Sequence, residues 1–491
     1  MSLGYYSFSR KRLSKGTSKS KTGSSIASIS SMDSDLMRIT SCAAFRRLQD
    51  KTQLFPLVEN DYPRTRLTHS IEVALTAKSI TFLINKLIDN ENTIKQTSIP
   101  HILKDAVEAA CYLHDIGNPP FGHYGETVIR NYFTNNWDLL EVVKEDEKIL
   151  LKDIIDKSQR EYFDFSKFDG NAQALRVVTK LEKFSETSEG GLNLTSAVLG
   201  SLIKYPFDST YTLEENKFGY FKSEEDVIEF LKCQKDYFEN YIHPGALIME
   251  AADDICMFVS DFEDSIKKGK IAAENIIKFP TRKSSATEFK KKFETFFTKN
   301  KKEGIDGNLT LISIKPLLYD VKNKLIVEVA EQFFSDFTDI TTNTGKYKRD
   351  LKKRCKKLNH LSLIEQCEHY AIVEMSKKLL NSNVYCNDEI VIPELKGEEI
   401  LLKILDLLTK SILLTPFDKI KKTSCKDSNS KVLKLFSKSF LTKYIDSVTQ
   451  LKKDGTYDIK KDVYLKLRLV IDQVSGMTDN YALDFYRKLF V

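Results

Sequence analysis

Apolar residues recur at three- and four-residue spacing along almost the whole chain, and this period restricts the fold more than any other feature. Proline, which interrupts helices, occurs 11 times in 491 residues, and glycine occurs 19 times. We expect a short extended piece at 389–393 (EIVIP), where β-branched residues follow one another. The sequence therefore predicts an all-α fold.

Four expected helices organise the region that carries the chemistry. The first covers 103–116 and ends before Gly117, a common C-terminal signal. The second runs over about 123–135, after a loop rich in proline and glycine. A third is expected over about 223–241, where Ser-Glu-Glu-Asp resembles a capping box. The fourth covers 243–268, because proline is tolerated in the first turn of a helix.

Composition and charge exclude several classes of protein. The chain is 41% hydrophobic and 29% charged, with a net charge of +6, as in a folded soluble protein that permits a polyanionic partner without requiring one. Its eight cysteines lie far apart without a C-x-x-C pair, so we expect neither a disulfide framework nor a thiolate zinc site. No window of about 18 apolar residues exists, and a cytoplasmic protein without a membrane span is expected.

Composition also suggests how the chain divides. Residues 1–32 are rich in Ser, Lys and Gly, which predicts a basic, mobile N-terminal arm. A Lys-rich stretch near 278–285 (KFPTRKSS) is the best candidate boundary. We therefore expect a catalytic core over 33–275 and a C-terminal helical region over 276–491, contributing to a base pocket and to oligomerisation.

Histidine is concentrated at one place in the sequence. The chain has seven histidines, and His69, His114 and His123 fall within one 55-residue span. His114 and Asp115 adjoin the predicted end of a helix, where both side chains can turn towards one point. Imidazole and carboxylate are ligands for a divalent ion, and His69 with an acidic residue of the long helix could complete the site. Taken singly, a His-Asp pair is more often structural.

Several ordered sequence motifs are more specific than this spacing. They are 46–53 (RRLQDKTQ), 64–70 (RTRLTHS), 114–126 (HDIGNPPFGHYGE), 168–173 (FDGNAQ), 204–205 (KY), 249–255 (MEAADDI) and 475–479 (SGMTD). Together they strongly resemble the HD-domain deoxyguanosinetriphosphate triphosphohydrolases of the large bacterial type. The resemblance runs from about Asp33 to the end of the chain.

The resemblance implies a metal-dependent enzyme that hydrolyses dGTP at the α-phosphorus to deoxyguanosine and inorganic triphosphate, and so controls dNTP pools. It implies metal ligands at His69, His114, Asp115 and Asp253, whereas Asp254 is expected to be a helix-face or outer carboxylate. Mg²⁺ or Mn²⁺ is the expected ion, and Ni²⁺, Zn²⁺ or Fe²⁺ could be bound after purification.

Other residue roles follow from the same resemblance. His123 and Glu126, three apart on one helix face, match the acid/base pair, with Glu126 orienting the imidazole. Asp261 matches the acceptor of the 3′-hydroxyl. The remaining matches to substrate-binding positions are Gln53 and Leu54 for the base, Arg66, Asn171, Lys204, Tyr205 and Lys217 for the phosphates, and Glu394 for the guanine amino edge.

Two departures keep alternatives open. Met257 stands where the family has a tyrosine against the deoxyribose, which admits a broader dNTP range. An arginine expected beside the guanine cannot be placed among the lysines near 420–434. The resemblance further implies a homo-oligomer, such as a hexamer, and binding of single-stranded DNA. The sequence admits two other classes: a regulatory HD protein that senses nucleotides or DNA, and a phosphodiesterase or nuclease, which the full set of motifs disfavours.

Overall fold

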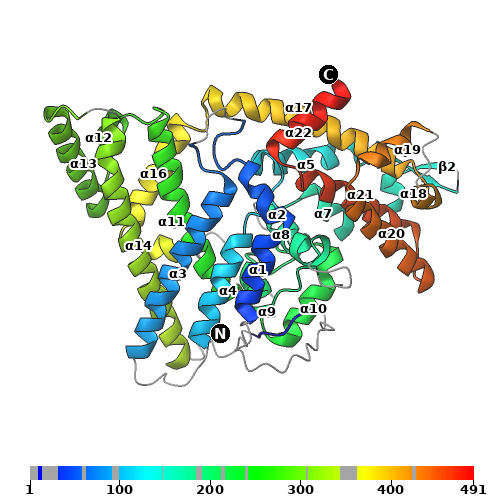
Figure 1. Ribbon diagram of the computed structural model, residues 1–491, viewed down its shortest axis with the longest axis horizontal. Helices are drawn as coiled ribbons and strands as arrows, with labels where there is room; N and C mark the ends of the chain where they lie inside the picture. The colour runs from blue at the N-terminus through cyan, green and yellow to red at the C-terminus, as the bar shows by residue number, and fades with distance from the viewer. Residues whose placement is uncertain are drawn as a thin grey trace.

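The computed structural model describes residues 9–13, 31–57, 62–90, 99–145, 147–183, 191–211, 216–237, 241–305, 308–342, 362–422 and 427–491. Within these ranges it consists of helices and one two-stranded sheet, so the predicted all-α fold is confirmed (Figure 1).

The first half of the chain provides eleven helices among the described residues. They are α1 (Ser31–Ser41), α2 (Ala43–Arg47), α3 (Arg66–Asn90), α4 (Ile99–Leu113), α5 (Gly122–Asn136), α6 (Leu151–Ile154), α7 (Arg160–Ser166), α8 (Gly170–Arg176), α9 (Ser196–Leu202), α10 (Glu225–Gln234) and α11 (Pro244–Lys267). Strands β1 (Glu141–Lys144) and β2 (Glu147–Leu150) form an antiparallel hairpin after α5.

The second half adds ten helices among the described residues. They are α12 (Ala273–Lys278), α13 (Ser284–Lys302), α14 (Leu309–Thr342), α16 (Tyr370–Asn383), α17 (Asp388–Leu413), α18 (Phe417–Lys422), α19 (Ser428–Val432), α20 (Lys438–Lys453), α21 (Ile459–Ser475) and α22 (Asp479–Phe490). Short helical turns are η2 (Leu48–Asp50), η3 (Val177–Leu181), η4 (Lys222–Glu224), η6 (Leu363–Gln366) and η7 (Leu433–Leu435).

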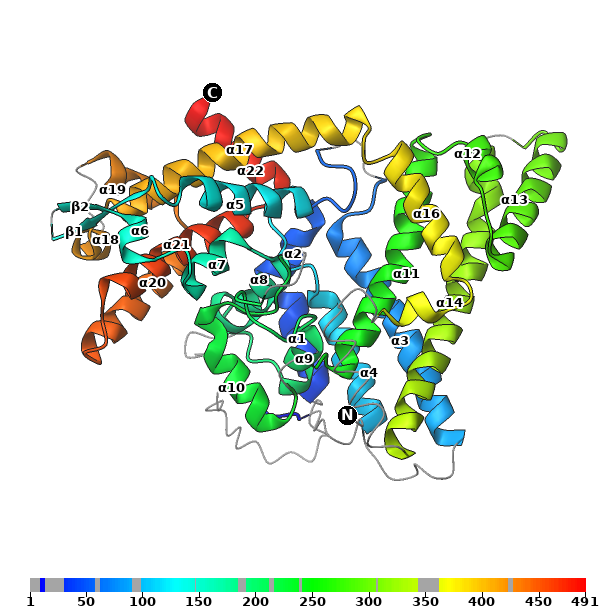
Figure 2. The same cartoon turned by 180° about the vertical axis from the view of Figure 1, so that it is seen from behind.

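Two hydrophobic cores hold these helices together. In the first, α3 packs between α4, α11 and α14, and buries Val73, Ala77 and Ile80 at the three- and four-residue spacing of a helix face. In the second, α17 and α21 pack against α5 and α7, and Trp137 is fully buried at the end of α5. Figures 1 and 2 show α12, α13 and α14 at one end of the molecule and α18 to α20 at the other, with α17 between them.

Most helix predictions near the motifs are confirmed, and two need correction. The structure has helices at 99–113, 122–136 and 244–267, close to three of those expected. The helix expected over about 223–241 begins as the turn η4 and ends at Gln234, because Lys235 adopts a left-handed backbone conformation. The extended piece expected at 389–393 is wrong. These residues lie in the first turns of α17, where the Asn387 side chain caps the helix by accepting a hydrogen bond from the Glu389 amide.

Part of the N-terminal arm packs on the core. The Arg12 guanidinium pairs with buried Asp35, and the Ser9 amide donates to Asp236 at 2.9 Å. The rest of 1–32, apart from the start of α1, lies outside the described residues, so the predicted mobility of the arm is untested. The division at 275/276 also stays a prediction, and both cores draw on residues from either side of it. No described helix is both long and apolar enough to cross a membrane.

Candidate active site

One cavity of about 450 Å³ collects the residues that the motifs predicted. It lies where α3, α11, the loop after α4, the start of α5 and the first turns of α17 meet. Every predicted site residue except Glu126 lines it: Gln53, Leu54, Arg66, His69, His114, Asp115, His123, Asn171, Lys204, Tyr205, Lys217, Asp253, Met257, Asp261 and Glu394. Folding thus brings together side chains separated by more than 300 positions in the sequence.

Two imidazoles and two carboxylates converge on one side of this cavity. The Nε2 atom of His69 lies 2.9 Å from Oδ1 of Asp253, and Nε2 of His114 lies 3.6 Å from the same oxygen. The His114 Nε2 atom is also 3.5 Å from Oδ2 of Asp115. Ligand atoms of His69, His114 and Asp115 all lie within 4.8 Å of one another. These four residues could therefore hold a single divalent ion.

The orientation of His114 supports this arrangement. Its Nδ1 atom lies 2.7 Å from the Cys111 carbonyl oxygen and donates to it, which leaves the Nε2 lone pair free. That Nε2 atom is buried and makes no hydrogen bond with any residue that the structure describes. Buried polar atoms are normally paired, and this one faces two carboxylates, so a cation is the partner that suits the site.

Electrostatics keep the carboxylates charged. Burial raises the pKa of Asp253, but His114 and His69 outweigh it and lower that pKa to about 2. Burial likewise opposes ionisation of Asp115, yet Arg66, whose Nη1 atom lies 2.9 Å from Oδ2, and the nearby histidines hold its pKa well below the ordinary value. Both side chains are thus available as anionic ligands at neutral pH.

The next residue along α11 is held elsewhere. Oδ2 of Asp254 accepts a hydrogen bond from Ser362 at 3.1 Å, and Lys377 lies 3.6 Å from Oδ1. Asp254 also borders the cavity, but no contact joins it to His69 or His114 among the described residues. The two adjacent carboxylates therefore have different surroundings.

The start of α5 presents a paired histidine and glutamate. Nδ1 of His123 lies 3.3 Å from Oε2 of Glu126, and the His123 side chain is 72% exposed while Glu126 is 1% exposed. Glu126 also contacts Arg130 at 2.8 Å and accepts from the Gly170 amide at 2.9 Å. Burial raises the pKa of Glu126, but its bond to His123 and the charge of Lys217 lower it well below the ordinary value. A fixed carboxylate thus orients a more accessible imidazole.

Glycine is required where this loop meets α3. Gly122 has a φ of +58°, and a Cβ atom there would lie 2.6 Å from Nη2 of Arg66. The C-terminal region also fixes the loop, because Asp479 accepts from the Phe121 amide at 3.0 Å and from the Thr52 amide at 3.1 Å. Asp479 thereby links the loop before α5 to the segment that carries Gln53.

Cations line the adjoining part of the cavity. Nζ of Lys204 lies 3.2 Å from Glu250, and Nζ of Lys217 lies 3.5 Å from Glu126. Although burial disfavours its charge, Glu250 and nearby groups hold the pKa of Lys204 well above the ordinary value. Asn171 follows Asp169, whose carboxylate caps α8. Together with Arg66 these side chains form a polar wall suited to a polyanion.

The opposite part of the cavity is more apolar. Met257 and Asp261 follow Asp253 at one-turn intervals along α11. Burial raises the pKa of Asp261 to about 6. Glu394 reaches the cavity from α17, and burial raises its pKa as well. These groups can accept hydrogen bonds from a sugar and a base.

Sequence reasoning missed several residues that line this cavity. Phe121 and Tyr124 lie inside the 114–126 motif, and Glu250 lies inside the 249–255 motif, so the motifs themselves pointed to them. Tyr385 and Ile390, at the junction of α16 and α17, had no such signal. Arg66 is the one arginine that lines the cavity among the described residues, so the expected base-contacting arginine is not found there.

Comparisons with known proteins agree with this arrangement. The family model for the HD domain matches residues 66–173, which include three of the four clustered ligands, and the phosphohydrolase-associated domain matches 426–488. A deoxyguanosinetriphosphate triphosphohydrolase-like protein of Listeria monocytogenes is 33% identical over 474 residues, 94% of either chain. Deoxyguanosinetriphosphate triphosphohydrolases of Enterobacter sp. and Yersinia pseudotuberculosis are 27% and 29% identical, over 93% of each chain. The chain therefore belongs to the family of HD-domain deoxyguanosinetriphosphate triphosphohydrolases and triphosphohydrolase-like proteins.

Proposed function

We propose that this protein is a metal-dependent triphosphohydrolase that converts dGTP into deoxyguanosine and inorganic triphosphate. The observation that carries the proposal is the cluster of His69, His114, Asp115 and Asp253 in the same cavity as three cationic side chains. The names of the relatives support the same substrate. Incubating the purified protein with each dNTP and a divalent metal, and identifying the products by chromatography, tests it.

Each part of the cavity has a role in this reaction. A divalent ion held by the four clustered residues supplies Lewis acidity at a phosphoryl oxygen, and Mg²⁺ or Mn²⁺ is the proposed ion. Arg66, Lys204 and Lys217 bind the phosphate oxygens and stabilise the charge that develops on the leaving group. His123 carries the proton at its imidazole, while Glu126 positions the ring.

The sugar and base occupy the more apolar part of the cavity. The Asp261 carboxylate accepts a hydrogen bond from the 3′-hydroxyl, and Glu394 accepts from the guanine amino group. Gln53 and Leu54 face the base from the segment that Asp479 anchors through Thr52. A carboxylate that pairs with the amino edge favours guanine over bases that lack this donor.

Met257 favours a broader specificity as the second candidate. A thioether packs against the sugar but has no rigid ring to exclude a 2′-hydroxyl. We therefore expect the parent enzyme to hydrolyse GTP and other dNTPs at measurable rates. Met257→Tyr should raise the ratio of kcat/KM for dGTP over GTP by about tenfold, the lower end of what one steric contact contributes. Met257→Leu, which keeps the volume without a ring, should leave that ratio unchanged, and a ratio equal in all three enzymes contradicts the role of residue 257.

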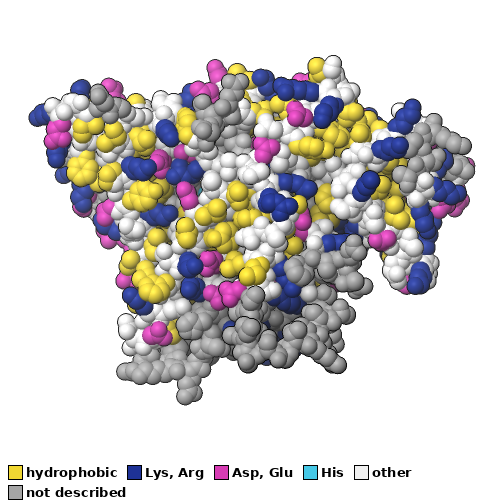
Figure 3. All heavy atoms as spheres, in the orientation of Figure 1, with side chains coloured by type: hydrophobic (Ala, Val, Ile, Leu, Met, Phe, Trp, Pro, Cys, Tyr) yellow, Lys and Arg dark blue, Asp and Glu magenta, His cyan; other side chains and the backbone are white. Residues whose placement is uncertain are grey.

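We also propose a homo-oligomer, on the evidence of an exposed apolar face. Ile71, Leu75 and Phe82 form a stripe along α3, and Ile312 and Tyr319 are exposed on the adjacent α14. Figure 3 shows hydrophobic side chains gathered over this part of the molecule. Contacts between copies would bury this surface. Binding of single-stranded DNA stays a prediction of the resemblance.

The mass of the particle in solution checks this proposal. Light scattering should give a multiple of 56.4 kDa for the parent. Combining Leu75→Lys with Phe82→Lys should reduce the assembly, because two buried cations without partners oppose association. Leu139→Lys, at an exposed position far from α3 in the sequence, is the control and should assemble like the parent. A monomeric parent, or an unchanged double variant, would exclude this face as the interface.

A further inference from the structure

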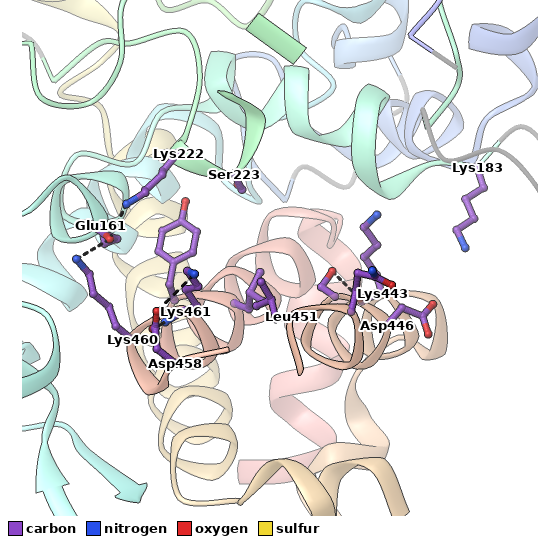
Figure 4. A pocket seen from close by; sticks show the side chains of 14 residues that line it. Glu161, Lys183, Lys222, Ser223, Lys443, Asp446, Leu451, Asp458, Lys460 and Lys461 are labelled. Carbon is purple, nitrogen blue, oxygen red and sulfur yellow. Dashed lines mark hydrogen bonds and ion pairs between the residues drawn. The ribbon is translucent and has the colours of Figure 1, made fainter. Parts of the chain in front are cut away.

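A second cavity lies between the C-terminal helices and the core. It has a volume of about 950 Å³, larger than the candidate active site, and no described residue lines both cavities. Helices α20 and α21 form one wall, and residues near η3, α7 and η4 form the other (Figure 4). Its size is that of a pocket for a nucleotide-sized ligand rather than for a single small ion.

Lysines dominate the polar lining, and several are already neutralised. Lys222 and Lys460 both pair with Glu161, at 2.8 and 2.7 Å. Lys461 lies 3.6 Å from Asp458. These three lysines occupy one side of the view in Figure 4, together with both carboxylates. Each lysine at this end of the groove is therefore already paired with a carboxylate.

The lysines that line the other end of the groove are unpaired among the described residues. Lys443, half-buried on α20, and exposed Lys183 form no ion pair with any residue in the part of the chain that the structure describes. The nearby Lys180 and Arg176 are paired with Asp226 and Asp472, at 2.5 and 2.6 Å.

The surroundings of Lys443 disfavour the positive charge of its ammonium group. Burial lowers the pKa of Lys443, and the charges of Lys180, Arg176 and Lys183 lower it further, opposed by Asp226. A protein gains nothing in stability by holding two unpaired cations beside other cations. An anionic ligand at this end of the groove would remove that repulsion.

Between the two ends the floor is apolar and carries small polar groups. Leu451, Leu465 and the ring of Tyr464 line it, and Ser447 and Gln450 offer hydrogen bonds. Asp446 lines the end where Lys183 and Lys443 lie, and Glu161 and Asp458 line the other end. The two ends differ in pairing, because only Lys183 and Lys443 among the lining lysines form no ion pair with a described residue. A long polyanion that followed the whole groove would meet Glu161 and Asp458, so the charge distribution favours a short anion.

We propose that this groove binds a chain of two or more phosphates, held at the end where Lys183 and Lys443 lie. The phosphate chain could be free inorganic triphosphate or part of a nucleotide whose base rests on Leu451 and Leu465. Either ligand would bridge the phosphohydrolase-associated helices and the core.

Lysine footprinting tests the site directly. The protein is acetylated with and without inorganic triphosphate, and separately with ATP, and the rate at each lysine is measured by mass spectrometry. At ten times the dissociation constant about nine sites in ten are occupied, so acetylation of Lys443 and Lys183 should fall about tenfold. Lys453, which is exposed on α20 outside the groove, should react at an unchanged rate.

Comparing the samples with triphosphate and with ATP shows which of the two ligands binds. Protection by both compounds indicates that the phosphate chain suffices, and protection by ATP alone indicates a nucleotide. Acetylation of Lys443 that is unaffected by either compound overturns the proposal. Protection by a single-stranded oligonucleotide alone would also overturn it, in favour of nucleic acid.

Matched variants give a second measurement. Lys183→Gln combined with Lys443→Gln should remove one triphosphate-binding event per chain in calorimetry, because both positions are at least partly exposed and the fold should persist. Lys421→Gln combined with Lys453→Gln changes the charge equally outside the groove and should bind like the parent. Equal binding by both double variants contradicts the site. Neither readout depends on catalysis, so the outcome is independent of the proposed enzymatic reaction.

Discussion

Replacing Asp253 by alanine is expected to abolish both metal binding and hydrolysis. One oxygen of the Asp253 carboxylate lies 2.9 Å from Nε2 of His69 and 3.6 Å from Nε2 of His114. Its removal leaves two imidazoles and Asp115 without a shared anionic partner. Since a bound metal contributes several kcal/mol to the stabilisation of charge in a phosphoryl-transfer transition state, we expect turnover to fall by about 10³-fold or more.

The neighbouring residue provides the matched control. Asp254→Ala removes a carboxylate from the same turn of α11, but the bonds it breaks join Ser362 and Lys377. This variant should retain the metal, measured by elemental analysis after dialysis, and most of the activity. Equal metal content in both variants and the parent would show that Asp253 is not a ligand. Circular dichroism of each variant checks that the fold is intact.

Ordered motifs, rather than residue spacing, pointed to the residues that line the cavity. His69, His114 and Asp253 are separated by 45 and 139 positions, so helical periodicity alone could not show that their side chains meet. The ordered motifs 64–70, 114–126 and 249–255 carried that information, and each contributes side chains to one cavity. Helix boundaries were also predictable where capping signals were strong, as at the start of α11.

Local strand propensity gave the wrong secondary structure at 389–393, where tertiary packing determines the conformation. Ile390, Val391 and Ile392 favour an extended strand, and Pro393 usually interrupts a helix. Yet α17 continues through Pro393, because the helix packs against α5 and α21. Gly397 allows this approach, since a Cβ atom there would lie 2.7 Å from the ring of Phe121. This packing brings Glu394 to the cavity. The extended piece predicted at 389–393 was therefore wrong, but the prediction that Glu394 lies in the site did not depend on it.

Some of the site had no signal in a single sequence. Tyr385 reaches the cavity only because α16 and α17 meet there, and no motif includes it. Burial, together with the smaller effect of the Asp261 charge, raises the pKa of Tyr385 well above its ordinary value, so the phenol stays protonated beside that carboxylate. Such long-range neighbours follow from packing and cannot be read from spacing along the chain.

His123→Ala is expected to keep the fold and the metal but to lose turnover by about 10²-fold or more, the usual contribution of a positioned acid or base. The side chain lies at the exposed mouth of the cavity, and within the described ranges it makes no hydrogen bond or ion pair with the four clustered side chains. Glu126 remains buried and paired with Arg130 after the substitution, so little else should change. Steady-state kinetics with dGTP, together with metal analysis, measure the effect.

The control is a histidine with a similar pairing elsewhere. His369 contacts Glu328 at 2.5 Å, at the start of α16 and outside the cavity, so His369→Ala should retain full turnover. An unimpaired His123→Ala enzyme would exclude His123 as the proton carrier.

The identity of the products decides which phosphorus is attacked. If water attacks the α-phosphorus while Arg66, Lys204 and Lys217 hold the phosphates, the water oxygen bonds to that phosphorus and the bond to the 5′-oxygen breaks. The proton that His123 moves from the water to the 5′-oxygen lets deoxyguanosine leave as the alcohol. The three phosphates then depart as one unbroken chain. Chromatography should therefore detect deoxyguanosine and triphosphate in equal amounts from the first turnovers. Early appearance of dGMP with pyrophosphate, or of dGDP with orthophosphate, would place the attack between phosphates and contradict the mechanism, because the same cations would then be stabilising a different leaving group.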